Sequence, residues 1–232
     1  MTDSMTQSFH VLRRIDQTDA GPVFEAAPET DLNVRVTVWS GIIPNVPLGI
    51  HPILAVPIGR GRNERQPLWV EDRPPGCLMV DIKEPLSLYD AAHIVSQIAE
   101  GLTALHSRRL AHGSVNPTRI VLDRDGSPTL IGTGVTAGTP ASDLQDVLKL
   151  FHGLAPDGPA IEAADMASLT AQLRELSLSA DRSASTLAEM LAKYDNSPPP
   201  EATTIRLMLD PVGFTDEVKV DVGPDRSERG LL

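Results

Sequence analysis

The stretch LAHGSVNPTRIVLD, residues 110–123, decides how the rest of the chain is interpreted. It joins a histidine, a Gly-Ser turn and an Asn-Pro pair to the apolar run IVL, which predicts a short β-strand. A turn placed in this way before a strand is typical of a loop that carries function. Between His112 and Ile120 the loop holds no carboxylate and no lysine. The stretch therefore predicts the backbone of an active-site loop without its chemistry.

Length, charge and cysteine content limit the classes of protein to consider. The chain has 232 residues, 41% hydrophobic and 22% charged, which predicts one globular domain or one domain with an appendage. A net charge of −11 argues against a nucleic-acid surface, which needs clustered lysine and arginine. The single cysteine, Cys77, fits a reducing compartment. With no signal-peptide pattern at the start and no long apolar run, we expect a cytoplasmic protein without a membrane span.

Strand patterns fill the first third of the sequence, and helical patterns dominate the remainder. Alternating apolar residues predict strands within residues 9–39 and a strand pair over 51–72, with the basic run 60–65 as a solvated turn. Pro44 and Pro47 exclude a regular helix in the gap before His51. This segregation of strands from helices predicts an α+β fold.

The central and C-terminal segments carry clear boundary signals. A helix is predicted over 87–108, opened by a capping box of Ser87 and Asp90. The Asp125-Gly126 pair predicts a hairpin turn, and helical stripes follow from Asp143 onward. The six histidines show no metal-binding spacing, and His93 and His106 are interpreted as structural. The last of the helical stripes, at Leu187, Met190 and Leu191, is predicted to open with a Thr186-x-x-Glu189 box.

Residues 196–204 form a proline-rich linker by composition, and residues 205–232 form a β-rich extension. Within the extension, TIRLMLD and EVKVDV alternate around PVGFTD, which predicts an appended β-hairpin.

The order and spacing of the earlier segments resemble the protein kinase fold, in particular its bacterial Ser/Thr kinase branch, over residues 9–195. The segments that carry this resemblance are IDQTDAGPVFEA (15–26), HPILAVPIGRGRNERQPLWVED (51–72), IAEGLTALHSRRLAHGSVNPTRIVLD (98–123), PTLIGTG (128–134), SDLQDVLKLF (142–151) and LSADRSASTLAEML (178–191). The resemblance implies a two-lobed kinase-like domain with a reduced N-lobe that has no regular αC helix, a helical C-lobe and the C-terminal hairpin-like extension.

The resemblance also assigns the positions of the family's catalytic groups. The phosphate-gripping lysine falls on Thr37, the catalytic base on Ser114 and the lysine that follows it on Asn116. The two magnesium ligands fall on Arg119 and Gly132. Loss of a positioned base alone costs about 10²–10⁴ in rate. The chain therefore resembles a degenerate pseudokinase that needs no cofactor, in which His112, Asp143 and Arg182 keep the family's structural roles.

A pseudokinase of this kind would act as a scaffold or regulatory module for a protein partner. Thr203 and Thr204 lie in the linker, and Leu207 follows Thr204 by three residues, as in sequences that phosphothreonine-reading domains bind. The partner would then be such a domain or an active Ser/Thr kinase. The simpler interpretation is that these threonines begin a strand. The hairpin also offers an edge through which two chains could dimerise.

Two other interpretations stay open at this point. The run GTGVTAG, residues 132–138, is a near match to a phosphate-binding turn, so a pseudokinase that senses ATP or ADP without phosphotransfer is the alternative. The pair His112 and Ser114 also suggests a nucleophilic hydrolase, but no Gly-x-Ser-x-Gly elbow accompanies it.

Overall fold

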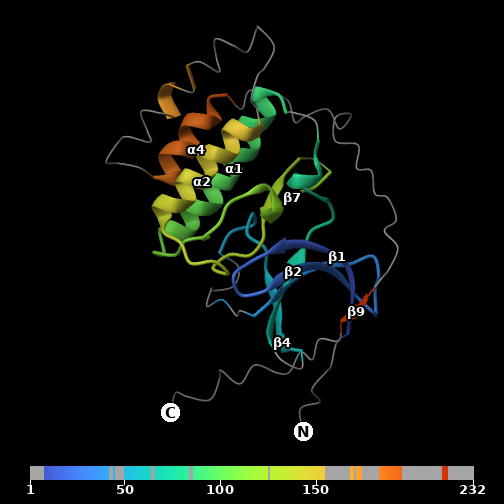
Figure 1. Ribbon diagram of the computed structural model, residues 1–232. Coiled ribbons are helices and arrows are strands. Elements are labelled where there is room, and N and C mark those ends of the chain that lie inside the picture. Colours follow the sequence, from blue (N-terminus) through green and yellow to red (C-terminus); the bar gives the residue numbers. More distant parts are fainter. Residues whose placement is uncertain are drawn as a thin grey trace. The chain divides into compact units, whose positions relative to one another are not determined.

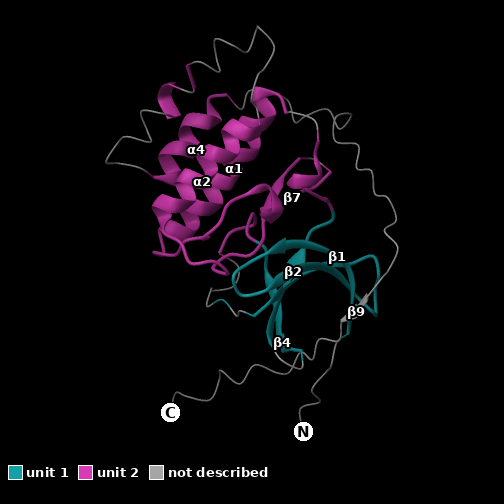
Figure 2. Ribbon diagram, viewed as in Figure 1, with its two compact units in different colours: residues 1–48, 55–75, 209–232 teal, residues 49–54, 76–208 magenta. Residues whose placement is uncertain are grey.

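The computed structural model describes residues 8–41, 44, 50–63, 66–83, 86–124, 126–154, 168–169, 171–173, 183–194 and 216–218. These residues form a mixed α+β fold of antiparallel sheets and helices, so the α+β part of the predicted fold class is confirmed (Figure 1). The chain divides into two compact units, and both contain segments that are distant in sequence (Figure 2). Unit 1 consists of residues 1–48, 55–75 and 209–232, and unit 2 of residues 49–54 and 76–208.

Unit 1 is built on one antiparallel sheet in the order β4-β5-β3-β2-β1-β9. Its strands are β1 (Phe9–Gln17), β2 (Pro22–Pro28), β3 (Arg35–Ser40), β4 (Pro57–Arg62), β5 (Pro67–Arg73) and β9 (Asp216–Val218). The alternation seen in the sequence separates the residues of β3 into two sets, because successive strand residues point to opposite faces. Val36 and Val38 belong to an apolar cluster, whereas Thr37 and Trp39 lie on the other face, and all four are buried.

Unit 2 contains a long helix, α1 (Leu88–His106), which packs against α2 (Pro140–Leu154) and α4 (Ala184–Ala192) (Figure 1). A small antiparallel sheet, β6 (Cys77–Leu78), β7 (Ile120–Leu122) and β8 (Pro128–Leu130), adjoins α1 through β8. Two 3₁₀ turns, η1 (Met79–Asp81) and η2 (Pro117–Arg119), complete the described elements. The core consists mainly of leucine, isoleucine, valine and alanine, as the low aromatic content of 3% requires.

The helix boundaries confirm one predicted cap and correct another. Ser87 is the N-cap of α1, and its hydroxyl accepts a hydrogen bond from the backbone N–H of Asp90 at 3.1 Å. The box predicted at Thr186 is wrong, because α4 begins at Ala184 and Thr186 lies inside it. Ser183 is the N-cap instead, and its hydroxyl accepts from the N–H of Thr186. Both positions offer a hydroxyl, and the sequence pattern selects the wrong one.

Two predicted strand boundaries also move. The predicted strand from His51 begins only at Pro57 in β4. The preceding residues include Leu54, which makes an isolated bridge to Leu130, and both of these leucines belong to unit 2. The first part of the basic run belongs to β4 rather than to a turn, since β4 extends to Arg62. The β7–β8 hairpin is confirmed by the pairing of Val121 with Thr129.

Candidate functional site

The loop after α1 is held by one buried carboxylate, Asp143. Its two oxygens accept hydrogen bonds from the backbone N–H groups of His112 and Gly113, each at 2.8 Å. One of those oxygens also lies 2.9 Å from Nε2 of His106, near the end of α1. Asp143 is fully buried in the first turn of α2, where the helix dipole favours a negative charge. This single side chain therefore joins α1, α2 and the loop between α1 and β7.

The imidazole of His112 is fully buried beside this carboxylate. Burial and the nearby Arg119 lower the pKa of His112 to about 4, although Asp143 and the backbone of Ile131 and Ser114 act in the opposite direction. A histidine with this pKa is neutral at pH 7, so it contributes as a packed group rather than as a cation.

The loop 132–138 lies directly against the loop that contains His112. The N–H of Gly134 donates to the carbonyl of His112 at 3.0 Å. Gly113 has a φ of 93°, and a Cβ added there would lie 1.9 Å from the carbonyl oxygen of Thr136. A Cβ on Gly138 would meet the backbone of Gly113 at 2.4 Å. The glycines of GTGVTAG thus serve the close contact of two backbone segments, which is a structural reason for this glycine-rich run.

Ser114 and Asn116 shape the turn into β7. Asn116 caps η2, because its side-chain oxygen accepts from the backbone N–H of Thr118 at 2.9 Å. Its amide nitrogen donates to the hydroxyl of Ser114, also at 2.9 Å. The polar groups at both predicted positions are therefore engaged in local turn geometry.

Arg119 is buried, with only 3% of its surface exposed, and its guanidinium donates to the hydroxyl of Thr136 at 3.0 Å. The carbonyl of Arg119 accepts from the N–H of Ile131, next to Gly132, whose φ of 81° lies in the left-handed region. The structure therefore brings Ser114, Asn116, Arg119 and the Gly132 backbone together in unit 2. Among these groups the charge is the positive charge of Arg119. A guanidinium cation neither coordinates a metal ion nor acts as a general base.

Thr37, the remaining predicted position, lies in unit 1 and is fully buried in the middle of β3. Its register partners are Glu25 on β2 and Glu71 on β5. The threonine is therefore flanked by a carboxylate-bearing residue on each neighbouring strand. This arrangement favours bound cations or arginine side chains rather than phosphate groups.

Each of these two glutamates has defined partners that the sequence analysis did not identify. Glu71 is 1% exposed and accepts hydrogen bonds from the indole N–H groups of Trp39, at 2.9 Å, and Trp69, at 3.1 Å. Glu25 forms ion pairs of 2.8 Å with both Arg13 and Arg73. Burial alone would raise the pKa of Glu25, but Arg73 and Arg13 outweigh it and hold that pKa below its usual value. Glu71 and Arg73, two positions apart within WVEDR and therefore on one face of the strand, were the available signal for this polar face.

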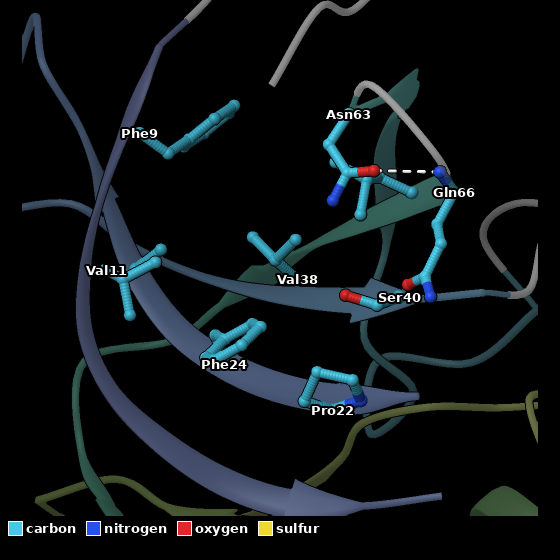
Figure 3. Close-up of a pocket in the computed structure, with 10 residues that line it drawn as sticks. Phe9, Val11, Pro22, Phe24, Val38, Ser40, Asn63 and Gln66 are labelled. Carbon is cyan, nitrogen blue, oxygen red and sulfur yellow. Dashed lines mark hydrogen bonds between the residues drawn. The ribbon is translucent and has the colours of Figure 1, made fainter. Parts of the chain in front are cut away.

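The opposite face of the same sheet encloses an apolar cavity of about 170 Å³ (Figure 3). Phe9 and Val11 from β1, Phe24 from β2 and Val38 from β3 point into it, and the polar ends of Asn63 and Gln66 lie near its rim. The backbone N–H of Gln66 donates to the side-chain oxygen of Asn63 at 2.8 Å. The sheet must curve for β1 and the β4–β5 turn to line one cavity.

Other predicted features have varied outcomes. The described residues do not include the possible phosphorylation and partner-binding residues Thr203, Thr204 and Leu207. They also do not include Arg182 or the 196–204 linker. Among the described residues, no three His, Cys, Asp or Glu side chains group closely enough to hold a metal ion. Of the helices that the structure describes, none combines the length and apolar character needed to cross a bilayer. No protein-family model matches the chain, and no curated protein matches it significantly.

Proposed function

We propose that the chain is a kinase-like module without phosphotransfer activity, which acts as a scaffold or regulatory partner of another protein in a bacterial signalling or assembly system. In this proposal unit 1 corresponds to the small lobe of a two-lobed kinase-like fold and unit 2 to its helical lobe. A sheet that precedes the long helix α1, and a buried aspartate that holds the loop after it, support this assignment.

The observation that carries the proposed inactivity is the buried Arg119. It stands where the resemblance places a magnesium ligand, and its guanidinium is fixed by Thr136 in a site that is 3% exposed. A cation at contact distance from a divalent metal costs on the order of a few kcal/mol in a partly solvated site. Ser114 is engaged with Asn116 and supplies no carboxylate for proton transfer.

The strand partners of Thr37 in unit 1, Glu25 and Glu71, also support the proposed lack of phosphotransfer. A lysine at this position would grip the phosphates of a nucleotide, but here a threonine lies between Glu25 and Glu71. Glu25 is paired with Arg13 and Arg73, and Glu71 accepts from two indole N–H groups, so the strand positions paired with Thr37 supply no lysine for a phosphate.

A thermal-shift titration with ATP and ADP, each with and without Mg²⁺, tests the proposal. We expect no magnesium-dependent rise in melting temperature at millimolar nucleotide, and no phosphate transfer to the chain or to a protein acceptor. An active bacterial Ser/Thr kinase serves as the positive control for transfer. A ligand at about 100 times its dissociation constant would add about 2.7 kcal/mol of stability, which such a scan detects easily. Magnesium-dependent stabilisation, or measurable transfer, would refute the proposal.

A magnesium-independent shift would instead support the alternative, a pseudokinase that senses nucleotide. The partner is tested separately, by incubating the chain with an active Ser/Thr kinase and mapping the phosphorylated residues. We expect modification at Thr203 or Thr204, with binding of a phosphothreonine-reading domain that the Thr203→Ala/Thr204→Ala variant loses. If both threonines stay unmodified, this choice of partner is wrong.

A further inference from the structure

The apolar cavity of unit 1 is built into the sheet by the register of its strands. Directly opposite residues of neighbouring strands point to the same face of a sheet, and three such pairs line the cavity together. These pairs are Val11 with Ala26, Phe24 with Val38, and Ser40 with Leu68. The strands β1, β2, β3 and β5 therefore share one lining (Figure 3).

The volume of the cavity, about 170 Å³, limits a bound molecule to about one ring. An apolar cavity of about 150 Å³ holds one benzene molecule, whereas pockets for drug-sized ligands begin at roughly 300 Å³. Phe9, Val38 and Leu68 belong to the apolar cluster of unit 1 and are each at most 2% exposed, so packing holds these walls in place. A nucleotide, with its base, sugar and phosphates, is too large for this space.

One end of the cavity is polar but uncharged. Asn63 and Gln66, from the turn between β4 and β5, lie there together with Ser40 of β3, whose hydroxyl points into the cavity (Figure 3). Two hydrogen bonds fix the turn: the N–H of Gln66 donates to the side-chain oxygen of Asn63 at 2.8 Å, and the N–H of Asn63 donates to the carbonyl of Gln66 at 3.1 Å. Among the described residues that line the cavity, none carries a charge. A bound molecule can therefore form a hydrogen bond at this end but meets no counter-charge.

We propose that this cavity binds a small neutral molecule with one aromatic ring and one hydrogen-bonding group, for which phenol is the simplest probe. The ring lies against the aromatic side chains of Phe9 and Phe24, where stacked or edge-on ring contacts add to the burial of apolar surface. The polar group lies toward Ser40. A charged molecule would lose its hydration in this cavity without gaining an opposite charge, so charged analogues are excluded. This proposal is independent of whether the chain lacks phosphotransfer activity.

Methyl NMR spectra of the full chain, labelled with ¹³C at the valine methyl groups, show where a probe binds. We expect phenol and benzene each to cause saturable shifts of the Val11 and Val38 signals, because both side chains line the cavity. The signals of Val95 and Val147, in the core of unit 2, should stay unchanged. Benzoate, which has the same ring and a negative charge, should move neither pair. Binding of benzoate as strong as that of phenol, or no saturable shift of Val11 and Val38 with phenol, would overturn the proposal.

Two substitutions, followed by isothermal titration calorimetry, test the polar end and the floor separately. Ser40→Ala removes one hydroxyl and should weaken phenol binding about threefold to tenfold while the affinity for benzene stays the same. Ser107→Ala, which removes an exposed hydroxyl in unit 2, is the matched control and should change neither affinity.

Ala26→Leu places a larger side chain in the fully buried floor and should abolish the binding of both compounds. The emission of Trp39 and Trp69 reports whether this variant is folded. A Ser40→Ala variant with an unchanged ratio of phenol to benzene affinity would refute the assigned polar end. Undiminished binding by folded Ala26→Leu would refute the cavity as the binding site.

Discussion

Asp143 accepts a hydrogen bond from the backbone N–H of His112 at 2.8 Å, across 31 positions of the sequence. It accepts a second from the N–H of Gly113, and the carboxylate is fully buried. At His112 and Gly113 the loop after α1 is thus held through backbone N–H groups. This contact does not depend on which side chains occupy these two positions.

Removal of the Asp143 carboxylate should destabilise unit 2 strongly. We expect Asp143→Ala to cost about 3–5 kcal/mol, because it leaves buried N–H groups without an acceptor. Asp143→Asn keeps one acceptor oxygen and should cost about half as much. Urea unfolding monitored by circular dichroism measures both. Asp146→Asn is the matched control on the same helix, since its bond to the N–H of Val115 is long, at 3.3 Å, and it should cost under about 1 kcal/mol. If Asp143→Ala, Asp143→Asn and the control Asp146→Asn all lose the same amount of stability, this role of Asp143 is wrong.

The lowered pKa of His112 predicts a pH dependence of stability. The pKa of His112 is about 4 in the folded chain against 6.5 for an unperturbed histidine, so the unfolded chain binds the additional proton. Stability is therefore complete above about pH 6.5 and is lost as the pH falls towards 4, by about 3 kcal/mol for this group. Urea unfolding at several values between pH 7 and 5 tests this window before most carboxylates titrate. In His112→Gln the slope should shrink, and an unchanged slope would assign the effect elsewhere.

The contact between the two loops of unit 2 is tested at Gly113. Gly113→Ala must shift the backbone of Thr136, since its Cβ would lie 1.9 Å from that carbonyl oxygen, and φ is 93°. We expect a loss of about 2–4 kcal/mol. Gly153→Ala is the control, because a Cβ there meets nothing within 4 Å and the residue is helical. That change should be neutral or stabilise the fold by up to about 1 kcal/mol. A Gly113→Ala variant as stable as the wild type would show that the loops can separate.

Glu71 offers a test in unit 1 with its own spectroscopic signal. Trp39 and Trp69 are the two tryptophans of the chain, and both donate to this carboxylate. Glu71→Ala leaves two buried indole N–H groups unsatisfied and should cost about 2–5 kcal/mol. Glu71→Gln keeps an acceptor and should cost less. Urea unfolding measured by tryptophan emission reports both losses. Similar emission spectra for all three folded proteins would contradict the shared hydrogen bonds.

The parts of the fold that were predictable are those set by local pattern. The alternation of Val36 and Val38 with Thr37 and Trp39 predicted a strand, and Ser87 predicted the start of a helix. The start of β4 was not predictable, because the apolar run from His51 fits a strand by pattern alone, whereas Leu54 bridges to Leu130 within unit 2.

Contacts between neighbours in sequence could be predicted, but contacts with distant parts of the chain could not. Residues within the loop after α1 are adjacent in sequence, so Ser114 and Asn116 could be placed together in advance. The row Glu25, Thr37 and Glu71 depends on the register of three strands, and a register is fixed by packing and turn geometry over the whole sheet. No local pattern in the sequence carries that information.

The pairing of β9 with β1 also determines how long β1 waits for its edge partner during protein synthesis. Val11 and Asp216 are partners although 205 positions separate them. At about 5–20 residues per second, a ribosome needs roughly 10–40 s to make the intervening chain. Throughout that interval β1 lacks its edge partner, and most segments of unit 2 emerge before that partner is made. A chaperone therefore has the whole of this interval in which to bind the open edge of β1.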